Sequence, residues 1–344
     1  MFGIMSYQKN IDQGLDLAFQ SAQERSLDLQ SSRVVIFSDH HKGAGDDADD
    51  FKQCAEIYRT ALKHYASNQF TLVILGDGEE LWECKPDEVT STYSDIFHLE
   101  KPFHEANRHL RIYGNHDDEW CYPEMVALHL EPFFEGIIVY EAMKYRVHDS
   151  GENLGTLFFI HGHQGTTLGD RFGRLSRFAV RYLWRPFQRL TNIKSTTPAT
   201  DWKLRSKHDS AMYNWAVKQH GVILVAGHTH KPNFPTYTQV DYFREIYTEL
   251  SRIPEALPKE GLEKIQADLS FANAQEQPCY INSGCCSFSD GDISGIEIES
   301  GQIRLVRWSS KEGELPRTVL DSADIKTFFK EVAQPADALP EVIE

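Results

Sequence analysis

Residues 34–41 read VVIFSDHH, a short apolar run that ends in aspartate and histidine. Four similar apolar runs follow along the chain, at residues 71–75 (TLVIL), 109–113 (HLRIY), 156–160 (TLFFI) and 222–226 (VILVA). Runs of about five residues rich in branched and aromatic side chains are too short for helices and are typical of strands buried on both faces. The sequence therefore predicts five buried strands.

Helical patterns lie between the first strands, because residues 49–67 and 93–108 carry apolar side chains at helical spacing. This alternation of strands and helices predicts crossover connections, a largely parallel sheet and an α/β fold. After Pro278 the pattern changes to a meander of short strands at a second sheet or at the edge of the first, at residues 279–283, 292–299 and 302–308.

Two segments interrupt this rhythm. Residues 170–219 are helical and rich in arginine, and residues 241–274 contain two helical patterns around a break with two prolines. We interpret both as insertions in a single domain over residues 1–310, the first of them a cap. Residues 311–344 are expected to form a C-terminal helix and an acidic tail.

The composition excludes some classes of protein. Of 344 residues, 51 are acidic and 35 are basic, which gives a net charge of −16 and argues against bulk binding of nucleic acid. The six cysteines form no CxxC pair, a pattern that suits free thiols in a reducing compartment. The N-terminal residues lack the features of a signal peptide, and no run approaches the ~20 apolar residues that span a bilayer. We expect a soluble, cytoplasmic protein.

The positions of the histidines indicate where a binding site lies. Seven of the 15 lie in short polar clusters that directly follow the predicted strands, at residues 38–41, 76–80, 114–117, 161–163 and 227–230. Because the carboxyl ends of parallel strands open onto one edge, where ligands bind, these clusters are expected to converge.

The converging side chains have the chemistry of metal ligands. Carboxylate, imidazole and amide groups without thiolate suit manganese, iron or zinc. There are enough of them for two ions that share a carboxylate, an arrangement suited to displacement at phosphorus. The candidate ligands are Asp39, His41, Asp77, Asn115, His161, His228 and His230.

The ordered motifs D-x-H, G-D-x-x-E, G-N-H-D, H-G-H and G-H-T-H resemble those of the calcineurin-like metallophosphoesterase superfamily. The resemblance implies a four-layer α/β/β/α sandwich that hydrolyses phosphate esters or pyrophosphates with metal-activated water, without a serine or cysteine nucleophile. It implies that Asp39, His41 and His230 hold one divalent ion and that Asn115, His161 and His228 hold the other. Asp77 would bridge the two ions.

The same resemblance assigns two catalytic residues. His116 would stay off the metals and act on the leaving group, and Asp117 would orient its imidazole. His163 is expected to line the pocket, where it can contact substrate. Glu80 stands where many members have aspartate. His40 is outside the general pattern, and we interpret His40 either as a residue that contacts the ligands from behind or as a surface residue.

The sequence leaves two alternatives to this function open. The chain can be a broad phosphodiesterase or nucleotidase, or a metal-stabilised scaffold that has lost its chemistry. All seven candidate ligands are present, which favours an enzyme. The substrate, the native metals and the oligomeric state stay open.

The arginine-rich insertion bears on the substrate. Within residues 171–189 arginines recur every three or four residues among aromatic and aliphatic side chains, and the helix they predict follows a ligand loop. Its placement resembles the cap of UDP-diacylglucosamine pyrophosphatases, which cleave a nucleotide-linked lipid. Arg174, Arg177 and Arg181 are therefore candidate contacts to a phosphorylated or lipid-linked substrate. The same stripe can touch the inner membrane surface, or it is an ordinary helix whose arginines pair with local carboxylates.

Overall fold

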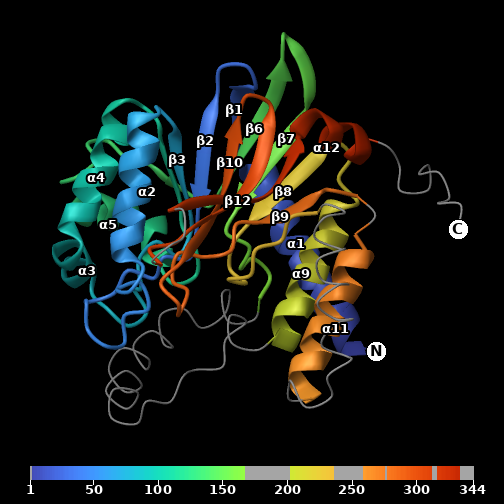
Figure 1. The fold of residues 1–344 in the computed structure, drawn as a ribbon, viewed down its shortest axis with the longest axis horizontal. Helices are drawn as coiled ribbons and strands as arrows, with labels where there is room; N and C mark the ends of the chain where they lie inside the picture. The colour runs from blue at the N-terminus through green and yellow to red at the C-terminus, as the bar shows by residue number, and fades with distance from the viewer. Residues whose placement is uncertain (1, 167–201, 236–258, 276, 312–315, 334–344) are drawn as a thin grey trace, which may run out of the picture.

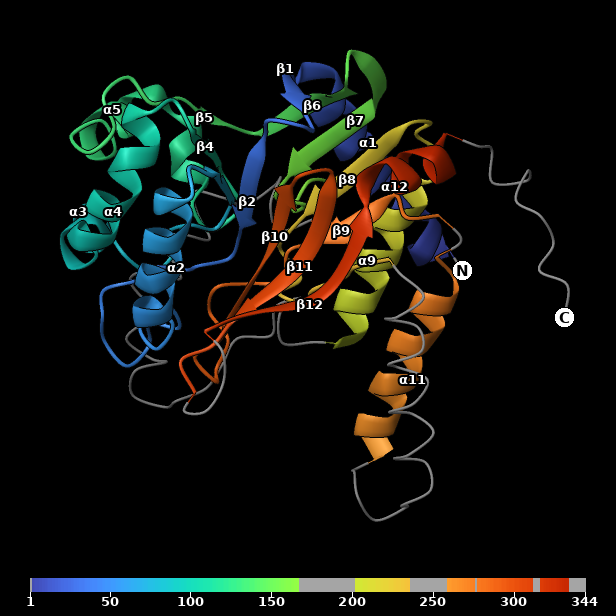
Figure 2. The same cartoon turned by 45° about the horizontal axis from the view of Figure 1, so that its top comes forward.

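The computed structural model describes residues 2–166, 202–235, 259–275, 277–311 and 316–333. Within these residues the strands form two sheets (Figures 1 and 2). The larger sheet has the order β12-β11-β10-β2-β3-β4-β5, and the smaller has the order β1-β6-β7-β8-β9.

The strands of the larger sheet are β2 (Arg33–Phe37), β3 (Thr71–Leu75), β4 (His109–Ile112), β5 (Val139–Tyr140), β10 (Ile293–Glu299), β11 (Gln302–Trp308) and β12 (Arg317–Asp324). Those of the smaller sheet are β1 (Gln23–Asp28), β6 (Ala142–Asp149), β7 (Glu152–Ile160), β8 (Val222–Ala226) and β9 (Tyr280–Asn282). The helices are α1 (Phe2–Ser21), α2 (Ala55–Ser67), α3 (Pro86–Thr92), α4 (Ser94–Glu105), α5 (Pro123–His129), α9 (Trp202–Ala216), α11 (Lys259–Asn273) and α12 (Ile325–Val332).

The alternation of side chains along β2 builds the layers. Val34 and Ile36 pack into the core between the two sheets, whereas Val35 and Phe37 pack against α2 and α4 on the outer face. On the far side, α1 and α9 cover the smaller sheet, and α11 packs on α9. The predicted four-layer α/β/β/α sandwich is therefore confirmed (Figure 1).

All five predicted strands are present, but they divide between the sheets. β2, β3 and β4 are parallel neighbours in the larger sheet, and β7 and β8 are parallel neighbours in the smaller one. The polar clusters thus lie at the carboxyl ends of strands in two sheets that pack face to face. The expected meander is present only in part: β10 and β11 pair antiparallel in the larger sheet, whereas β9 lies parallel to β8 in the smaller one. β12 continues the meander beside β11, in a segment where we expected only a helix and a tail.

One predicted helix begins later than expected. The pattern over residues 49–67 predicts a helix from Asp49, but α2 begins at Ala55. The reason is the Asp49 carboxylate, which accepts hydrogen bonds from the backbone N–H groups of Gly43, Gly45 and Phe51. These bonds hold residues 43–51 as a loop beside the ligand loop of β2.

The insertions are described in part. The end of the first is α9 and the end of the second is α11, as the helical patterns predict. Residues 167–201, 236–258 and 334–344 lie outside the described residues, and so does most of the expected cap and the acidic tail. Within the described part of the chain no helix is long and apolar enough to cross a membrane.

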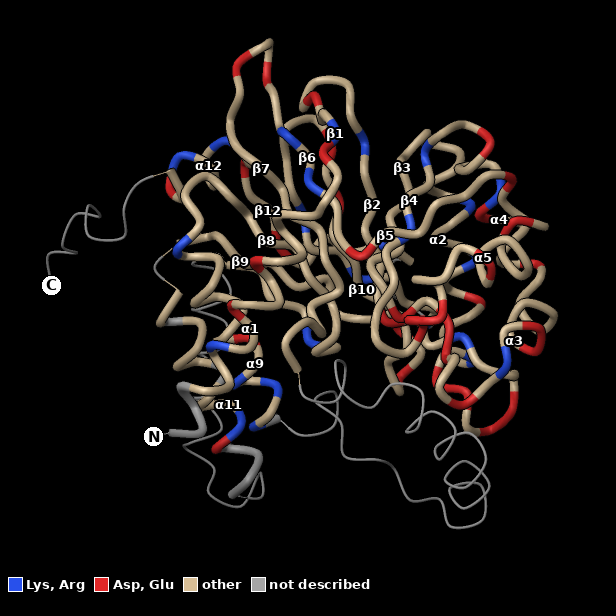
Figure 3. Tube along the Cα trace, turned by 180° about the vertical axis from the view of Figure 1, so that it is seen from behind, with Lys and Arg blue, Asp and Glu red and all other residues tan. Residues whose placement is uncertain are grey.

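Acidic residues, red in Figure 3, gather around α3 and in the loops near β5 and β10.

Candidate metal centre

The candidate ligands stand on tight turns at the carboxyl ends of the strands. Most of these residues have left-handed backbone conformations, with φ of 52° at Asp39 and His41, 50° at Asp77, 69° at His228 and 55° at His230. Such values are uncommon for residues other than glycine and cluster at functional sites, where the surrounding structure holds them in place. The turns aim these side chains into one volume between the sheets.

Asp39, His41 and His230 form the first group. Nε2 of His230 lies 3.2 Å from Oδ1 of Asp39 and 3.0 Å from Nε2 of His41. One ligand atom from each of the three residues lies within 4.8 Å of the others. These three side chains, which come from both sheets, could together hold one metal ion.

Asp77, His161 and His228 form the second group, with the same spacing of ligand atoms. Nε2 of His161 lies 3.1 Å from Oδ2 of Asp77. The other ring nitrogen, Nδ1, donates a hydrogen bond to the Leu75 carbonyl at 2.9 Å, so Nε2 is the nitrogen that can coordinate a metal. His41 lies 3.7 Å from the same Asp77 oxygen, so Asp77, a member of the second group, also lies within reach of the first. His41, Asp77 and His116 meet the same spacing as a further group.

Three candidate ligands each have a buried polar atom with no hydrogen-bond partner. These atoms are Oδ1 of Asn115, Nε2 of His161 and Nε2 of His228. Buried polar atoms are nearly always satisfied, so each one that is not needs an explanation. Because all three are atoms that coordinate divalent ions, the residues fit a metal pair held by nitrogen and oxygen ligands.

The charges of the site balance each other within the protein. Burial alone would lower the pKa of His161, but Asp77 and Asp39 outweigh it and raise the pKa to about 9. Burial would likewise raise the pKa of Asp77, but His161 and His116 hold it well below its usual value. Burial lowers the pKa of His228. The aspartates are therefore ionised and available as ligands.

Two glycines allow the loops to approach this closely. A Cβ at Gly114 would collide with the Asp77 carboxylate, and a Cβ at Gly227 would collide with that of Asp39. The backbone N–H groups of His116 and His228 use this closeness to donate hydrogen bonds to Asp77 and Asp39. The loops thus fix the ligand carboxylates as well as supplying the ligands.

The family model for calcineurin-like phosphoesterases matches residues 32–232, which is more than half of the chain and spans all seven candidate ligands. The chain belongs to the calcineurin-like phosphoesterase family. Among solved structures, vacuolar protein sorting 29 from Cryptosporidium parvum is similar, with 13% identity and a TM-score of 0.35 over 85% of this chain and 98% of that chain. A single mutant of Vps29 from Entamoeba histolytica has 13% identity and a TM-score of 0.32 over the same shares. No curated protein matches the chain.

In this calcineurin-like phosphoesterase the partner of His116 differs from the expectation. The Asp117 carboxylate accepts hydrogen bonds from the backbone N–H groups of Gly114, Asp77 and Gly78, and these contacts turn it away from the imidazole. Instead, Oε2 of Glu80 lies 2.7 Å from Nδ1 of His116. Asp117 therefore braces the turns that carry the ligands, and Glu80 holds the imidazole.

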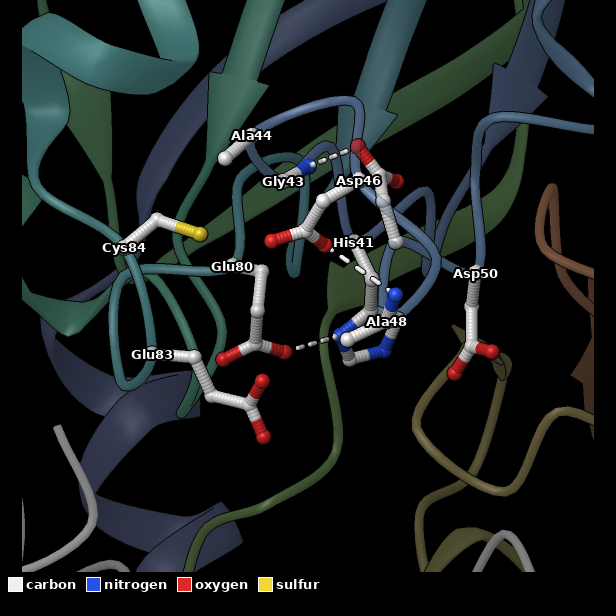
Figure 4. A pocket seen from close by; sticks show the side chains of 10 residues that line it. His41, Gly43, Ala44, Asp46, Ala48, Asp50, Glu80, Glu83 and Cys84 are labelled. Atoms are coloured by element: carbon white, nitrogen blue, oxygen red, sulfur yellow. Dashed lines mark hydrogen bonds and ion pairs between the residues drawn. The ribbon is translucent and has the colours of Figure 1, made fainter. Parts of the chain in front are cut away.

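Glu80 also contacts the metal cradle. The same oxygen accepts a hydrogen bond from Nδ1 of His41 at 2.9 Å (Figure 4). Since the bond engages Nδ1, Nε2 of His41 is the nitrogen directed at the first metal group. One carboxylate thus orients both a candidate ligand and a candidate proton donor. Burial would raise the pKa of Glu80, but the two histidines lower it to about 2.

A buried ion-pair network beneath the ligand loops was not predicted from the sequence. Glu79 accepts hydrogen bonds from Arg111 at 2.6 Å and from Trp120 at 2.8 Å, and Arg111 also bonds Glu100 at 3.1 Å. Lys42 lies 3.3 Å from Glu79 and 3.4 Å from Glu100. The sequence signals for this network were Arg111 inside the apolar run 109–113, and Lys42 and Glu79, which lie within two positions of candidate ligands.

The first insertion also supports the site, through α9. His208 bonds the Gly162 carbonyl through Nε2 and Tyr7 through Nδ1, both at 2.8 Å. Its neighbour Asp209 accepts hydrogen bonds from Thr229, between the two ligands of that loop, and from Tyr280. Helix α9 therefore holds two ligand loops in place through hydrogen bonds.

The remaining candidates divide between buried and undescribed positions. His163 is buried 5.6 Å from the His161 ring, and its Nδ1 has no hydrogen-bond partner. His40 is also buried, packed on Phe51 and Tyr58, and is not a surface residue. Arg174, Arg177 and Arg181 lie outside the described residues.

A pocket opens beside the first metal group (Figure 4). His41, Glu80, Glu83, Asp46 and Asp50 line it, among others. Its acidic walls explain part of the negative charge of the chain.

Proposed function

We propose that this protein hydrolyses a phosphate ester or a pyrophosphate with two divalent metal ions. The observation that carries the proposal is the position of Asp77 between two cradles of imidazole and carboxylate ligands, each with ligand atoms within 4.8 Å. The buried, unpartnered atoms of Asn115, His161 and His228 support it. Manganese, iron and zinc all suit this ligand set.

The chemistry that a pair of bound divalent ions would supply here is activation of water and neutralisation of charge at phosphorus. Asp39, His41 and His230 would hold one ion and Asn115, His161 and His228 the other, with Asp77 shared. The protein itself supplies the proton for the leaving group. Glu80 engages Nδ1 of His116, which leaves Nε2 as the ring nitrogen that donates.

The proposal is tested with purified protein stripped by EDTA and then supplied with manganese. We expect hydrolysis of p-nitrophenyl phosphate or bis-p-nitrophenyl phosphate that is absent before manganese is added. Hydrolysis of the diester alone identifies a phosphodiesterase. Bound manganese without hydrolysis of either ester, under conditions where the protein is folded, contradicts the enzyme proposal and supports a scaffold.

The His116→Gln variant separates the proton donor from the ligands. We expect it to keep its metal and to lose about 10²-fold or more in kcat on phenyl phosphate, whose leaving group needs a proton, because general acid catalysis contributes effects of that size. Metal content is measured by mass spectrometry beside the rate. A loss of metal equal to that of an Asp77 variant would show that His116 is a ligand instead.

We further propose a nucleotide- or lipid-linked substrate. Its support is the arginine stripe over residues 171–189 of the sequence, in a chain that is otherwise acidic. Changing Arg174, Arg177 and Arg181 to alanine together should raise KM for a lipid-linked pyrophosphate and weaken sedimentation with anionic vesicles. The KM for p-nitrophenyl phosphate, which has no lipid, serves as the control. If neither KM nor vesicle binding changes, the stripe is ordinary helix packing.

A further inference from the structure

Three consecutive residues grip His116. The Glu80 carboxylate contacts its Nδ1 at 2.7 Å, and the backbone N–H of Leu81 donates to its carbonyl at 2.9 Å. The indole of Trp82 then stacks on the imidazole, with ring centroids 4.5 Å apart and an angle of 20° between the planes. The first two contacts have evident roles, whereas the stacked indole has none assigned.

The contact with Glu80 fixes one atom of the ring but not its plane. The 2.7 Å contact at Nδ1 lacks the geometry of a hydrogen bond, so it leaves the tilt of the imidazole unfixed. A parallel indole removes this freedom, since any tilt of the imidazole lifts it off the indole face. The ring of His41 meets the same imidazole edge-on at 4.6 Å and 82°, so a tilt is opposed from two directions.

The chemistry of the indole suits this role. A π face attracts a cationic imidazole and has no lone pair that would take a hydrogen bond from Nε2. A carboxylate or hydroxyl in the same place would bind the proton that is meant for the substrate. Trp82 can therefore hold the ring without occupying its donor.

We propose that Trp82 is a positioning residue that fixes the plane of the His116 imidazole so that Nε2 faces the leaving-group oxygen. This inference rests on the proposed hydrolase function for its effect on rate. The stacking itself can be tested without any activity.

The first test is spectroscopic and uses metal-free protein with labelled histidine. The ring-proton resonances of His116 are assigned by their loss in His116→Gln. In the parent protein the indole should shift them upfield, and in Trp82→Leu they should move downfield. Trp82→Phe should restore part of the shift, while the resonances of His228, which lies outside the stack, stay in place. Unmoved His116 resonances in Trp82→Leu would overturn the proposal.

The second test uses two esters that differ in their leaving groups, p-nitrophenyl phosphate and phenyl phosphate, with manganese-loaded protein. Phenolate needs a proton more than nitrophenolate does, so Trp82→Leu should lose about tenfold in kcat on phenyl phosphate and little on the nitrophenyl ester. KM should stay constant, and Trp82→Phe should recover most of the rate.

A double-mutant comparison decides whether Trp82 acts through His116. Adding Trp82→Leu to His116→Gln should cost no further rate on phenyl phosphate, because the group that it positions is gone. Equal losses on both esters, or a full tenfold loss in the His116→Gln background, would show a general structural role and refute the proposal. An inactive parent protein contradicts the hydrolase function alone, since the resonance shifts are read separately.

Discussion

The Asp77→Asn variant is expected to lose metal from both cradles and to hydrolyse p-nitrophenyl phosphate at least about 10³-fold more slowly than the parent protein. Asp77 stands within reach of ligands from both groups, at 3.1 Å from His161 and 3.7 Å from His41. Asparagine keeps the shape but removes the charge that two cations share. Metal ions contribute several kcal/mol to the transition state, which corresponds to a loss of this size.

The matched control for this variant is Asp95→Asn. Asp95 is a half-exposed aspartate on α4 that pairs with Arg59 at the surface, away from the ligand loops. Its variant should keep both the metal content and the rate. An Asp77→Asn protein that retains two metal ions per chain and most of its activity would contradict the bridging role.

The Arg111→Met variant is expected to lower the free energy of unfolding by about 3–5 kcal/mol, because it leaves two buried carboxylates with only Lys42 to balance them. Glu79 and Glu100 both have no exposed side-chain surface, and Arg111 has 1%. Burial would raise the pKa of Glu79, but Arg111 and Lys42 lower it to about 2. Urea denaturation measures the loss.

Arg146→Met is the control, since Arg146 is also a strand arginine paired with a glutamate. Its side chain is 48% exposed and that of Glu24 is 42% exposed, so the pair should contribute only about 0–1 kcal/mol. If the two arginine variants unfold at the same urea concentration, the buried network does not stabilise the protein as we infer. The Arg111 variant should also bind metal more weakly, because Glu79 and Lys42 flank ligands.

Short apolar runs made the strands predictable. The five runs correspond to β2, β3, β4, β7 and β8 because burial on both faces demands branched side chains at successive positions. The ligand clusters followed, since the polar residues come directly after those strands. Periodicity alone did not reveal that the strands divide between two facing sheets; the family resemblance implied it.

Side-chain direction was beyond the sequence. Asp117 directly follows His116 and has the right chemistry to orient it, yet its oxygens are taken by three backbone N–H groups. Glu80, 36 positions earlier, reaches the ring instead. The position of Arg111 inside an apolar run and that of Lys42 beside a ligand were the only signs that both point inward, and charged residues are usually expected at the surface.

The two-metal reaction is tested most directly by titrating metal-free protein with manganese while following the hydrolysis of p-nitrophenyl phosphate and bis-p-nitrophenyl phosphate. Since the proposed reaction needs both ions, the rate should stay low through the first equivalent and rise with the second, to a plateau at two ions per chain. Full activity at one equivalent, or no hydrolysis of either ester when two ions are bound, would contradict a dinuclear phosphoesterase.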